Sequence, residues 1–369
     1  QCGKTYLSKF LNGDKDFDYL NFDIIKDRKR LFKMDWYRDR SLVIFDEIHK
    51  MKKWKAWLKG IFDSDAETQQ FLVTGSAKIG VFKKVGDSLA GRYFSYRLYP
   101  IDLKELRFIV SDPSARKELQ ISGLSEKQIQ KSLLERLLSV SGFPEPFLEN
   151  NISFYNKWQQ VHLDVILKQD ILETEKVHNI KQLETLAMML TERVGSLLSY
   201  NSLREDLATD DKSVKRWVDL LENSYLVFRL YPYTHKSLTT GLKKSPKLYF
   251  YDYCRIDDEG ARLENFVALS LLKEVHFRRD ALGQIYDLQF LRDKQQKEID
   301  FLILKNKKPY LMIEVKMTDT TPSESFSKFE KSFPDVKKVQ LVQALDREHL
   351  TSGRVLVAPV SSWLSKMDF

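Results

Sequence analysis

Two adjacent carboxylates, Asp46 and Glu47, form the first pattern of residues that indicates chemistry. They follow residues 41–45, which read as a short apolar strand of the kind buried in a parallel sheet. Because ligands of open α/β sheets bind just beyond the carboxyl ends of strands, the pair is placed for a nucleotide-hydrolysing site. Asp46 would hold Mg²⁺ through its hydration shell, and Glu47 would accept a proton from the attacking water. The stretch alone fits a helix cap with an incidental glutamate equally well, so the flanking residues decide.

The start of the chain supports the nucleotide interpretation. Gly3, Lys4 and Thr5 match the second half of the phosphate-binding loop G-x-x-x-x-G-K-[ST] and lead into an amphipathic helix. In such a loop, backbone N–H groups hold the phosphates, Lys4 would reach the β- and γ-phosphates, and Thr5 would ligate Mg²⁺. We therefore expect ATP and Mg²⁺ to bind here, and we expect the first glycine of the loop and its preceding strand to lie ahead of Gln1.

Two features further downstream fit the same site. Residues 71–76 read as a second buried strand that ends in hydroxyl groups, and Thr74 and Ser76 stand where such ATPases sense the γ-phosphate. Arg92 follows a glycine turn and is a candidate arginine finger, because a guanidinium matches the charge that spreads over the γ-phosphate oxygens. A surface arginine without a catalytic role is an interpretation of equal weight.

A resemblance to a known family rests on three segments: LVIFDEIHKMKKWKAWLKGIFD, FLVTGSAK and SLAGRYFSYRLYPIDLKEL. They resemble a prokaryotic family of AAA-like P-loop ATPases, in which a C-terminal region of unassigned function follows the ATPase core. The resemblance covers nearly the whole chain, and its one departure is the front of the phosphate loop. It implies a bacterial or archaeal ATPase of defence or DNA-transaction type without defining the substrate.

A second set of candidate catalytic residues lies near the C-terminus. Residues 286–316 read as three strands joined by tight polar turns. Strand alternation puts Glu314 and Lys316 on one face, and a short turn lays the strand of Asp300 alongside theirs. The carboxylates of Asp300 and Glu314 are suited to bind a hard divalent cation that activates water, while Lys316 supports the nucleophile or the phosphate.

The order of these elements, with the pattern D…E-x-K, resembles the PD-(D/E)xK restriction-endonuclease-like nucleases. An upstream helix that carries Glu264 and a downstream helix and strands between residues 322 and 360 complete the resemblance. It implies metal-dependent cleavage of a phosphodiester bond. Two alternatives remain open: strands with ordinary exposed charges, and a nuclease fold kept as a binding platform without cleavage.

The elements that position these residues predict an α/β protein in four parts. In the first part, alternating helices and strands predict the parallel sheet of a P-loop NTPase. In the second part, amphipathic periodicity predicts helices, and we find no candidate catalytic residues there. The third part has a helix-turn-helix pattern, and the fourth part mixes strands and helices. The predicted boundaries are 1–100 for the AAA-like ATPase domain, 101–185 for the helical lid or linker, 186–238 for the winged helix-turn-helix and 239–369 for the restriction-endonuclease-like domain.

The third part offers a candidate nucleic-acid surface. Residues 201–207 and 212–223 read as two helices joined by a turn, and the strand that follows alternates like a wing. The exposed face of the second helix carries Lys212, Lys215 and Arg216, which are suited to contact phosphates, although two acids dilute the charge of this face. Winged helices in ATPases also serve as protein-interaction or lid domains, so both interpretations remain open.

The composition bounds the class of protein. A length of 369 residues is too great for one ordinary core, and 43% hydrophobic with 30% charged residues is typical of a soluble globular chain. No apolar run approaches a membrane span, and two cysteines far apart fit a reducing cytoplasm and exclude a cysteine-based zinc site. The net charge of +8 permits nucleic-acid contact without establishing it. We expect a cytoplasmic protein without membrane contact, with DNA or RNA and a second copy of the chain as candidate partners.

These patterns lead to one leading function and one alternative. The leading hypothesis is a Mg²⁺-dependent ATPase coupled to binding or cleavage of nucleic acid through the C-terminal nuclease-like domain. The alternative is a nucleotide-dependent signalling or assembly switch whose nuclease-like platform is catalytically inert. Nucleic-acid binding that weakens steeply with salt would favour the first, because phosphate contacts release counterions.

Overall fold

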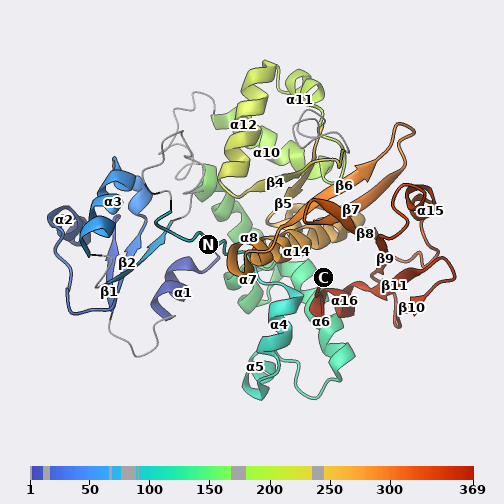
Figure 1. Ribbon diagram of the computed structural model, residues 1–369, viewed down its shortest axis with the longest axis horizontal. Coiled ribbons are helices and arrows are strands. Elements are labelled where there is room, and N and C mark those ends of the chain that lie inside the picture. Colours follow the sequence, from blue (N-terminus) through green and yellow to red (C-terminus); the bar gives the residue numbers. More distant parts are fainter. Residues whose placement is uncertain are drawn as a thin grey trace. The chain divides into compact units, whose positions relative to one another are not determined.

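The structure, a computed structural model shown in Figure 1, describes residues 2–10, 17–65, 69–75, 89, 91–167, 180–234 and 245–369. Of the predicted site residues, Ser76 lies outside these ranges. By its internal contacts the chain divides into two units, each described by itself: unit 1 holds residues 1–98 and 223–225, and unit 2 holds residues 99–222 and 226–369. Within the described ranges, every helix is too short or too polar to cross a lipid bilayer.

Unit 1 is built on a three-stranded parallel sheet in the order β1-β2-β3. Its elements are α1 (Lys4–Phe10), β1 (Phe17–Asn21), α2 (Ile25–Lys33), β2 (Leu42–Asp46), η1 (Ile48–Lys50), α3 (Trp54–Asp65) and β3 (Gln70–Thr74). The predicted apolar strand is therefore observed as β2, whose residues from Val43 to Phe45 are fully buried. Burial on both faces is what a central strand of a parallel sheet requires.

The register of the sheet aligns three polar residues at its carboxyl edge. Asp46, the last residue of β2, pairs with Asn21 on β1 and with Thr74 on β3. All three strands are parallel, so their final residues meet at one edge. The apolar residues before them hold this edge in place, since Phe45 packs against Trp36 and Phe71 at ring distances of 5.4 and 5.7 Å.

The described residues of unit 2 up to residue 222 form helices joined by loops. Its elements are α4 (Leu103–Ile109), α5 (Pro113–Glu118), α6 (Glu126–Val140), α7 (Pro144–Glu149), α8 (Ile152–Asp164), α10 (Ile180–Met189), η3 (Leu190–Arg193), α11 (Tyr200–Asp206) and α12 (Asp211–Asn223). A capping box of Ser125 and Gln128 begins α6. The pair α11 and α12 stands where the helix-turn-helix is predicted, and the winged-helix identity stays a prediction.

The second half of unit 2 holds two sheets. A two-stranded antiparallel sheet pairs β4 with β5, and a six-stranded sheet has the order β10-β11-β9-β8-β7-β6, parallel among β11, β9 and β8 and antiparallel elsewhere. The elements are β4 (Val227–Leu230), β5 (Lys247–Phe250), η4 (Tyr253–Arg255), α14 (Glu259–Leu282), β6 (Tyr286–Arg292), β7 (Glu298–Lys305), β8 (Lys308–Lys316), α15 (Glu324–Glu330), β9 (Lys337–Val342), β10 (His349–Leu350), β11 (Val355–Pro359) and α16 (Val360–Ser365).

The long helix α14 connects these sheets. It contacts β5, β6 and β8 and runs behind the orange strands in Figure 1. The side chain of Asp258 caps its first turn, and Gly283, at φ 66°, ends it in the left-handed conformation that glycine adopts without strain. Its inward face is buried and includes Phe266, Val267 and Ser270. Because α14 packs against these strands, it fixes the position of Glu264 relative to them.

Candidate functional site

Asp46 is the centre of the first candidate site. It lies at the carboxyl end of β2 and is 2% exposed. Its Oδ2 accepts hydrogen bonds from the hydroxyl of Thr5 at 2.8 Å and from the hydroxyl of Tyr19 at 2.6 Å. Its Oδ1 accepts one from the hydroxyl of Thr74. The structure thus brings together three of the predicted residues, Thr5, Asp46 and Thr74, from α1, β2 and β3.

These hydrogen bonds set the charge of Asp46. Burial raises the pKa of the carboxyl, but the hydroxyl donors and the backbone N–H of Glu47 together lower it further than burial raises it. Asp46 is therefore ionised at neutral pH. Tyr19 and Asn21, whose amide nitrogen lies 3.4 Å from Asp46 Oδ2, are additional members of the site. Asn21 is the register partner of Asp46, and Tyr19, two residues earlier on β1, reaches Asp46 with its hydroxyl. The sequence pattern revealed neither residue.

Glu47 leaves the sheet in an unusual backbone conformation. Its φ of 54° and ψ of 22° are left-handed, which is uncommon for a residue other than glycine. The backbone N–H donates to Thr74 O and to Asp46 Oδ1, both at 3.1 Å, and these bonds hold the turn. The turn directs the side chain toward His49 and Lys50, whose nitrogen atoms lie 3.7 and 3.9 Å from Glu47 Oε2.

The carboxyl of Glu47 is suited to accept a proton near neutral pH. Burial, the largest influence, raises its pKa to about 7, although the charge of Lys50 acts in the opposite direction. Burial also lowers the pKa of His49 to about 4, so its ring is neutral at pH 7. Within the described residues, Glu47 Oε2 is buried and accepts no hydrogen bond. An acid near its pKa with one unused oxygen has the properties of a general base.

The other predicted residues of unit 1 have different surroundings. Gly3 takes a positive φ of 82° at the start of α1, and the charge of Lys4 is close enough to lower the pKa of Glu47. Arg92 contacts α3, where its Nε lies 3.1 Å from Asp63 Oδ1 and its guanidinium stands over the ring of Phe62. The role of Arg92 as a finger stays a prediction.

The second candidate site lies in unit 2, where β7 meets β8. Phe301 pairs with Ile313 in this antiparallel pair, so Asp300, one residue before Phe301, lies opposite Glu314, one residue after Ile313. Asp300 Oδ2 accepts the backbone N–H of Val315 at 2.9 Å, which fixes the aspartate against β8. Glu314 is 3% exposed, and Lys316 Nζ lies 3.2 Å from its Oε2. Asp300, Glu314 and Lys316 therefore gather as the spacing predicts.

The electrostatics of this cluster indicate surplus negative charge. Burial and the nearby charge of Asp300 raise the pKa of Glu314 to about 8. Burial and the same aspartate raise the pKa of Glu264, on α14, to about 7. Glu314 and Glu264 both lie close to Asp300, so the ionisation of any of these carboxyl groups is disfavoured by the others unless a cation balances their charge.

Two residues of β5, Lys247 and Tyr249, also belong to the cluster, and the sequence pattern did not reveal them. Tyr249 donates its hydroxyl to Glu264 Oε1 at 2.7 Å. Lys247, which is 2% exposed, lies 3.4 Å from the same oxygen and forms a second ion pair with Glu298. One signal in the sequence could have revealed them: Lys247 stands beside the apolar residues of β5, and a charge buried in such a strand requires charged partners.

Both sites offer oxygen ligands, which suit a hard divalent cation. In unit 1 these are the hydroxyl of Thr5 and the carboxylate of Asp46, and in unit 2 the carboxylates of Asp300 and Glu314. In the part of the chain that the structure describes, no three His, Cys, Asp or Glu side chains are arranged to hold a metal ion together. A cation at either site would thus rest on two side chains with other oxygen ligands.

The predicted nucleic-acid face of α12 is exposed. Lys212, Lys215 and Arg216 all lie on the solvent side of the helix. Two of the acids of the same helix, Asp219 and Glu222, form ion pairs with the guanidinium of Arg229 on β4. This pairing reduces the negative charge beside the basic residues of α12. Contact of this face with DNA or RNA stays a prediction.

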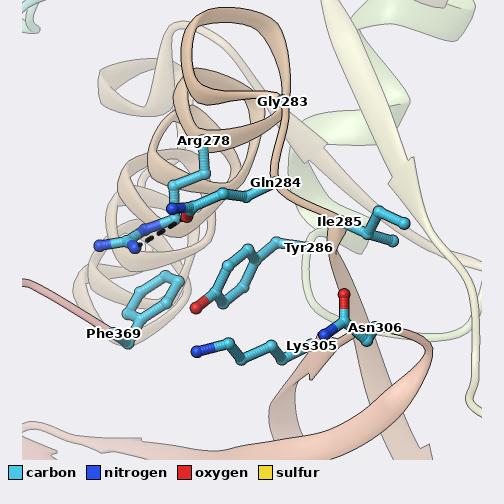
Figure 2. Close-up of a pocket in the computed structure, with 8 residues that line it drawn as sticks. All are labelled: Arg278, Gly283, Gln284, Ile285, Tyr286, Lys305, Asn306 and Phe369. Carbon is cyan, nitrogen blue, oxygen red and sulfur yellow. Dashed lines mark hydrogen bonds between the residues drawn. The ribbon is translucent and has the colours of Figure 1, made fainter.

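A hollow of about 380 Å³ lies at the C-terminal end of α14 (Figure 2). The guanidinium of Arg278 faces the rings of Tyr286 and Phe369, each 5.1 Å from its central carbon, and also pairs with Asp368. Its charge thus attaches the last residues of the chain to α14. The lining residues are Arg278, Gly283, Gln284, Ile285, Tyr286, Lys305, Asn306 and Phe369, which include none of the predicted site residues.

Three protein-family models match the chain, and each covers about a third of it or less. The first is an AAA domain at residues 1–107. The other two are domains of unknown function, DUF8612 at residues 131–254 and DUF4143 at residues 259–363. The candidate site of unit 1 lies inside the AAA match, and the carboxylates of the second site lie inside the DUF4143 match.

Similar proteins match over most of the chain. An uncharacterized protein of Methanocaldococcus jannaschii is 24% identical over 355 residues, which are 91% of this chain and 77% of the relative. An uncharacterized protein of Mycobacterium tuberculosis is 24% identical over 88% of this chain and 70% of its own length, and one of Haemophilus influenzae is 24% identical over 82% and 75%. The match of the first 107 residues to the AAA domain points, at the level of the family, to a P-loop AAA-like ATPase.

Proposed function

We propose that unit 1 binds ATP with Mg²⁺ and hydrolyses it, with Glu47 as the general base. The observation that carries this proposal is the arrangement around Asp46. The hydroxyl of Thr5, in the phosphate-loop motif, and the hydroxyl of Thr74, at the end of β3, both donate to the ionised carboxylate of Asp46 at one edge of the parallel sheet. This is the edge at which open α/β sheets bind ligands. The AAA match of residues 1–107 supports the same function.

The residues of the site have distinct tasks in this proposal. Lys4 and the backbone that follows Gly3 bind the phosphates, and Thr74 senses the γ-phosphate beside Asp46. Glu47 takes a proton from the water that attacks the γ-phosphorus, and the γ-phosphate leaves the ADP oxygen as the new bond forms. Thr5 and Asp46 would hold Mg²⁺, which neutralises charge on the β- and γ-phosphates.

Substitution of Glu47 tests this assignment. In a chain that carries the complete phosphate loop, Glu47→Gln should keep ATP affinity and lose roughly 10²-fold or more in turnover, the size of a general-base contribution. Phosphate release and fluorescent-nucleotide binding measure the two quantities. Asp39→Asn, which changes an exposed acid of the same unit, is the matched control and should keep turnover. Undiminished hydrolysis by Glu47→Gln would remove Glu47 from this role.

A second candidate activity for the same chain is cation-dependent cleavage of a phosphodiester bond in unit 2. It is favoured by the gathering of Asp300, Glu314 and Lys316 around a buried surplus of negative charge. Asp300 and Glu314 would hold a divalent cation, which activates water and stabilises the leaving oxygen. Lys316 would lie beside the phosphate. This activity would couple ATP hydrolysis to nucleic acid. If these residues do not cleave nucleic acid, the chain would instead be a nucleotide-dependent signalling or assembly switch.

The cleavage hypothesis is tested with Asp300→Asn, which keeps the shape of the side chain. Wild type should cleave single- or double-stranded DNA or RNA with Mg²⁺ or Mn²⁺, and the variant should lose roughly 10²-fold or more while ATP hydrolysis is unchanged. Substrates are compared with and without ATP. Equal residual cleavage in both proteins would contradict the nuclease assignment and leave a binding platform.

A further inference from the structure

The turn between β7 and β8 presents lysines that no ion pair neutralises. Lys305, Lys307 and Lys308 are exposed at this turn, and Lys337, at the start of β9, is exposed at the same end of the sheet. Among the residues that the structure describes, none of these ammonium groups pairs with a carboxylate. The exposed Asp335, two residues before Lys337, offsets part of the charge. The surplus is positive, and it attracts anions to this end of the sheet.

The backbone of the turn is strained at one of these lysines. Lys305 pairs with Lys308, and the two residues between them, Asn306 and Lys307, have positive φ angles of 52° and 65°. Turns of this kind favour asparagine followed by glycine, because most side chains are strained in the left-handed conformation. Asn306 fits this preference, whereas Lys307 stands where glycine would be relaxed. Strain of this kind is a reason to seek a function for the lysine side chain.

Aromatic rings hold two of the lysines in place beside the hollow at the end of α14. Lys305 Nζ lies 5.6 Å from the ring centre of Tyr286 and 5.3 Å from that of Tyr310. Lys337 Nζ lies 5.0 Å from the ring centre of Tyr310 and donates to its hydroxyl at 3.2 Å. The rings attract the ammonium groups without cancelling their charge. The positions of these charges are therefore set before a ligand binds.

The hollow beside Lys305 has the lining of a site for a flat polar group. Its volume of about 380 Å³ lies within the range of about 300–1,000 Å³ that pockets for small ligands have. The half-buried ring of Phe369 packs 5.8 Å from that of Tyr286, and Lys305 points toward both (Figure 2). The amides of Gln284 and Asn306 also line the hollow, and that of Asn306 has no hydrogen-bond partner among the described residues. An aromatic ring beside amide groups is suited to a nucleobase.

The chemistry of this surface favours one kind of partner. The other cation of the hollow, Arg278, is balanced by Glu274 and Asp368, so the lysines supply the available charge. A single-stranded nucleic acid alternates phosphates with bases, which stack on aromatic rings and form hydrogen bonds through their edges. An acidic peptide or an anionic bilayer would meet the lysines but leave the ring and the amides of the hollow unused.

We propose that this end of unit 2 binds a single strand of DNA or RNA. One base enters the hollow against the ring of Phe369 and forms hydrogen bonds with Asn306, while the neighbouring phosphates contact the lysines of the turn and Lys337. Lys305 lies about 17 Å along β7 from Asp300, at about 3.4 Å per residue, so the site is separate from the carboxylates at which cleavage is proposed. The inference goes beyond that cleavage site and does not depend on it.

Fluorescence anisotropy of a labelled strand of about 12 nucleotides tests the proposal in the full chain. EDTA is present and ATP is absent, so that neither cleavage nor nucleotide binding contributes. The variant Lys305→Ala/Lys307→Gly/Lys308→Ala preserves the turn, because glycine suits its left-handed position. It should weaken binding roughly tenfold or more and reduce the slope of log affinity against log salt by about 2, since each phosphate contact on a single strand contributes about 0.7.

Two further variants separate charge from the hollow. Lys117→Ala/Lys131→Ala/Lys157→Ala removes the same charge from exposed positions on α5, α6 and α8, and this control should keep the affinity and the salt slope of wild type. Phe369→Leu removes the flat ring but no charge. It should weaken binding roughly fivefold or more and leave the salt slope unchanged, because stacking releases no counterions.

The outcomes separate this inference from the cleavage site. An unchanged affinity and slope in the variant of the turn would place binding elsewhere, such as on α12, and overturn the inference. No strand binding by wild type would also overturn it, as would equal, lysine-dependent binding of polyglutamate or phosphatidylserine vesicles. If circular dichroism shows that the triple variant is unfolded, Lys305→Ala and Lys308→Ala decide, each lowering the slope by about 0.7. Lysine-dependent binding without cleavage that depends on Asp300 would contradict the cleavage site alone.

Discussion

At the scale of single residues, the adjacent acids Asp46 and Glu47 acquire opposite properties from their surroundings. Hydroxyl donors keep Asp46 ionised despite its burial, whereas burial leaves Glu47 with a pKa of about 7. The left-handed turn at Glu47 separates the two carboxyl groups, because it directs one into the sheet edge and the other toward Lys50. One acid is thereby suited to hold a cation and the other to accept a proton.

The pH dependence of turnover should reveal this division. Because the base must be ionised, hydrolysis should fall as pH decreases through the pKa of Glu47, near 7. Lys50 lowers that pKa, so Lys50→Met should move the acid limb of the turnover profile upward, by roughly half a pH unit for one partly exposed charge pair. Turnover at saturating Mg²⁺-ATP between pH 5.5 and 9 measures the limb. Lys52→Met is the matched control, and an unmoved limb in Lys50→Met would contradict the account.

At the scale of elements, the contact of α14 with β5 assembles the second site. Asn265, which is fully buried, donates to Phe250 O and accepts from Phe250 N, both at 2.7 Å. The side chain thereby satisfies both backbone groups of a strand residue, as a neighbouring strand would. Since Glu264 is the preceding residue of the helix, the same contact sets the distance from Glu264 to Lys247 and Tyr249 on β5.

Removal of this amide should loosen β5 specifically. Asn265→Leu leaves two buried backbone groups without partners, which costs about 1–3 kcal/mol for each group. The variant should lose about 2–6 kcal/mol of unfolding free energy in urea, and the amide hydrogens of residues 247–250 should exchange faster. Ser270→Ala is the matched control, because that buried hydroxyl donates only within α14, to Phe266 O. Equal losses in the two variants would show that Asn265 has no special part in holding β5.

The sequence predicts many of the helices and strands, and there are physical reasons why it does not predict every residue of the two sites. The alternation of residues 286–316 predicted three strands, which are observed as β6, β7 and β8, because one buried face imposes a period of two. The meeting of Asp300 with Glu314 followed from the short turn between their strands. Lys247 and Tyr249 were not predicted, since only tertiary packing brings β5 beside α14. The same holds for Tyr19, whose hydroxyl reaches Asp46 only because β1 and β2 pair in the folded sheet.

At the scale of the whole molecule, the chain carries two candidate phosphate chemistries, one in each unit. The first lies within the match to the AAA domain, and the second lies within the match to a domain of unknown function. Each site has a buried carboxylate at a strand and a nearby lysine, yet their polar networks consist of different residues. The sequence singled out the carboxylates of both candidate sites, because each motif is local, but not Tyr19, Asn21, Lys247 or Tyr249. The coupling of ATP hydrolysis to nucleic acid remains a proposal.

The cation-dependent binding of ATP in unit 1 is the central claim, and one titration tests it most directly. In a Glu47→Gln chain with the complete phosphate loop, calorimetry compares ATP binding with excess Mg²⁺ and with a chelator. We predict that Mg²⁺ tightens binding by roughly tenfold or more, that Thr5→Val removes this dependence, and that Thr5→Ser keeps it, because the hydroxyl is the ligand. Equal ATP affinity with and without Mg²⁺, or full Mg²⁺ dependence in Thr5→Val, would contradict the account.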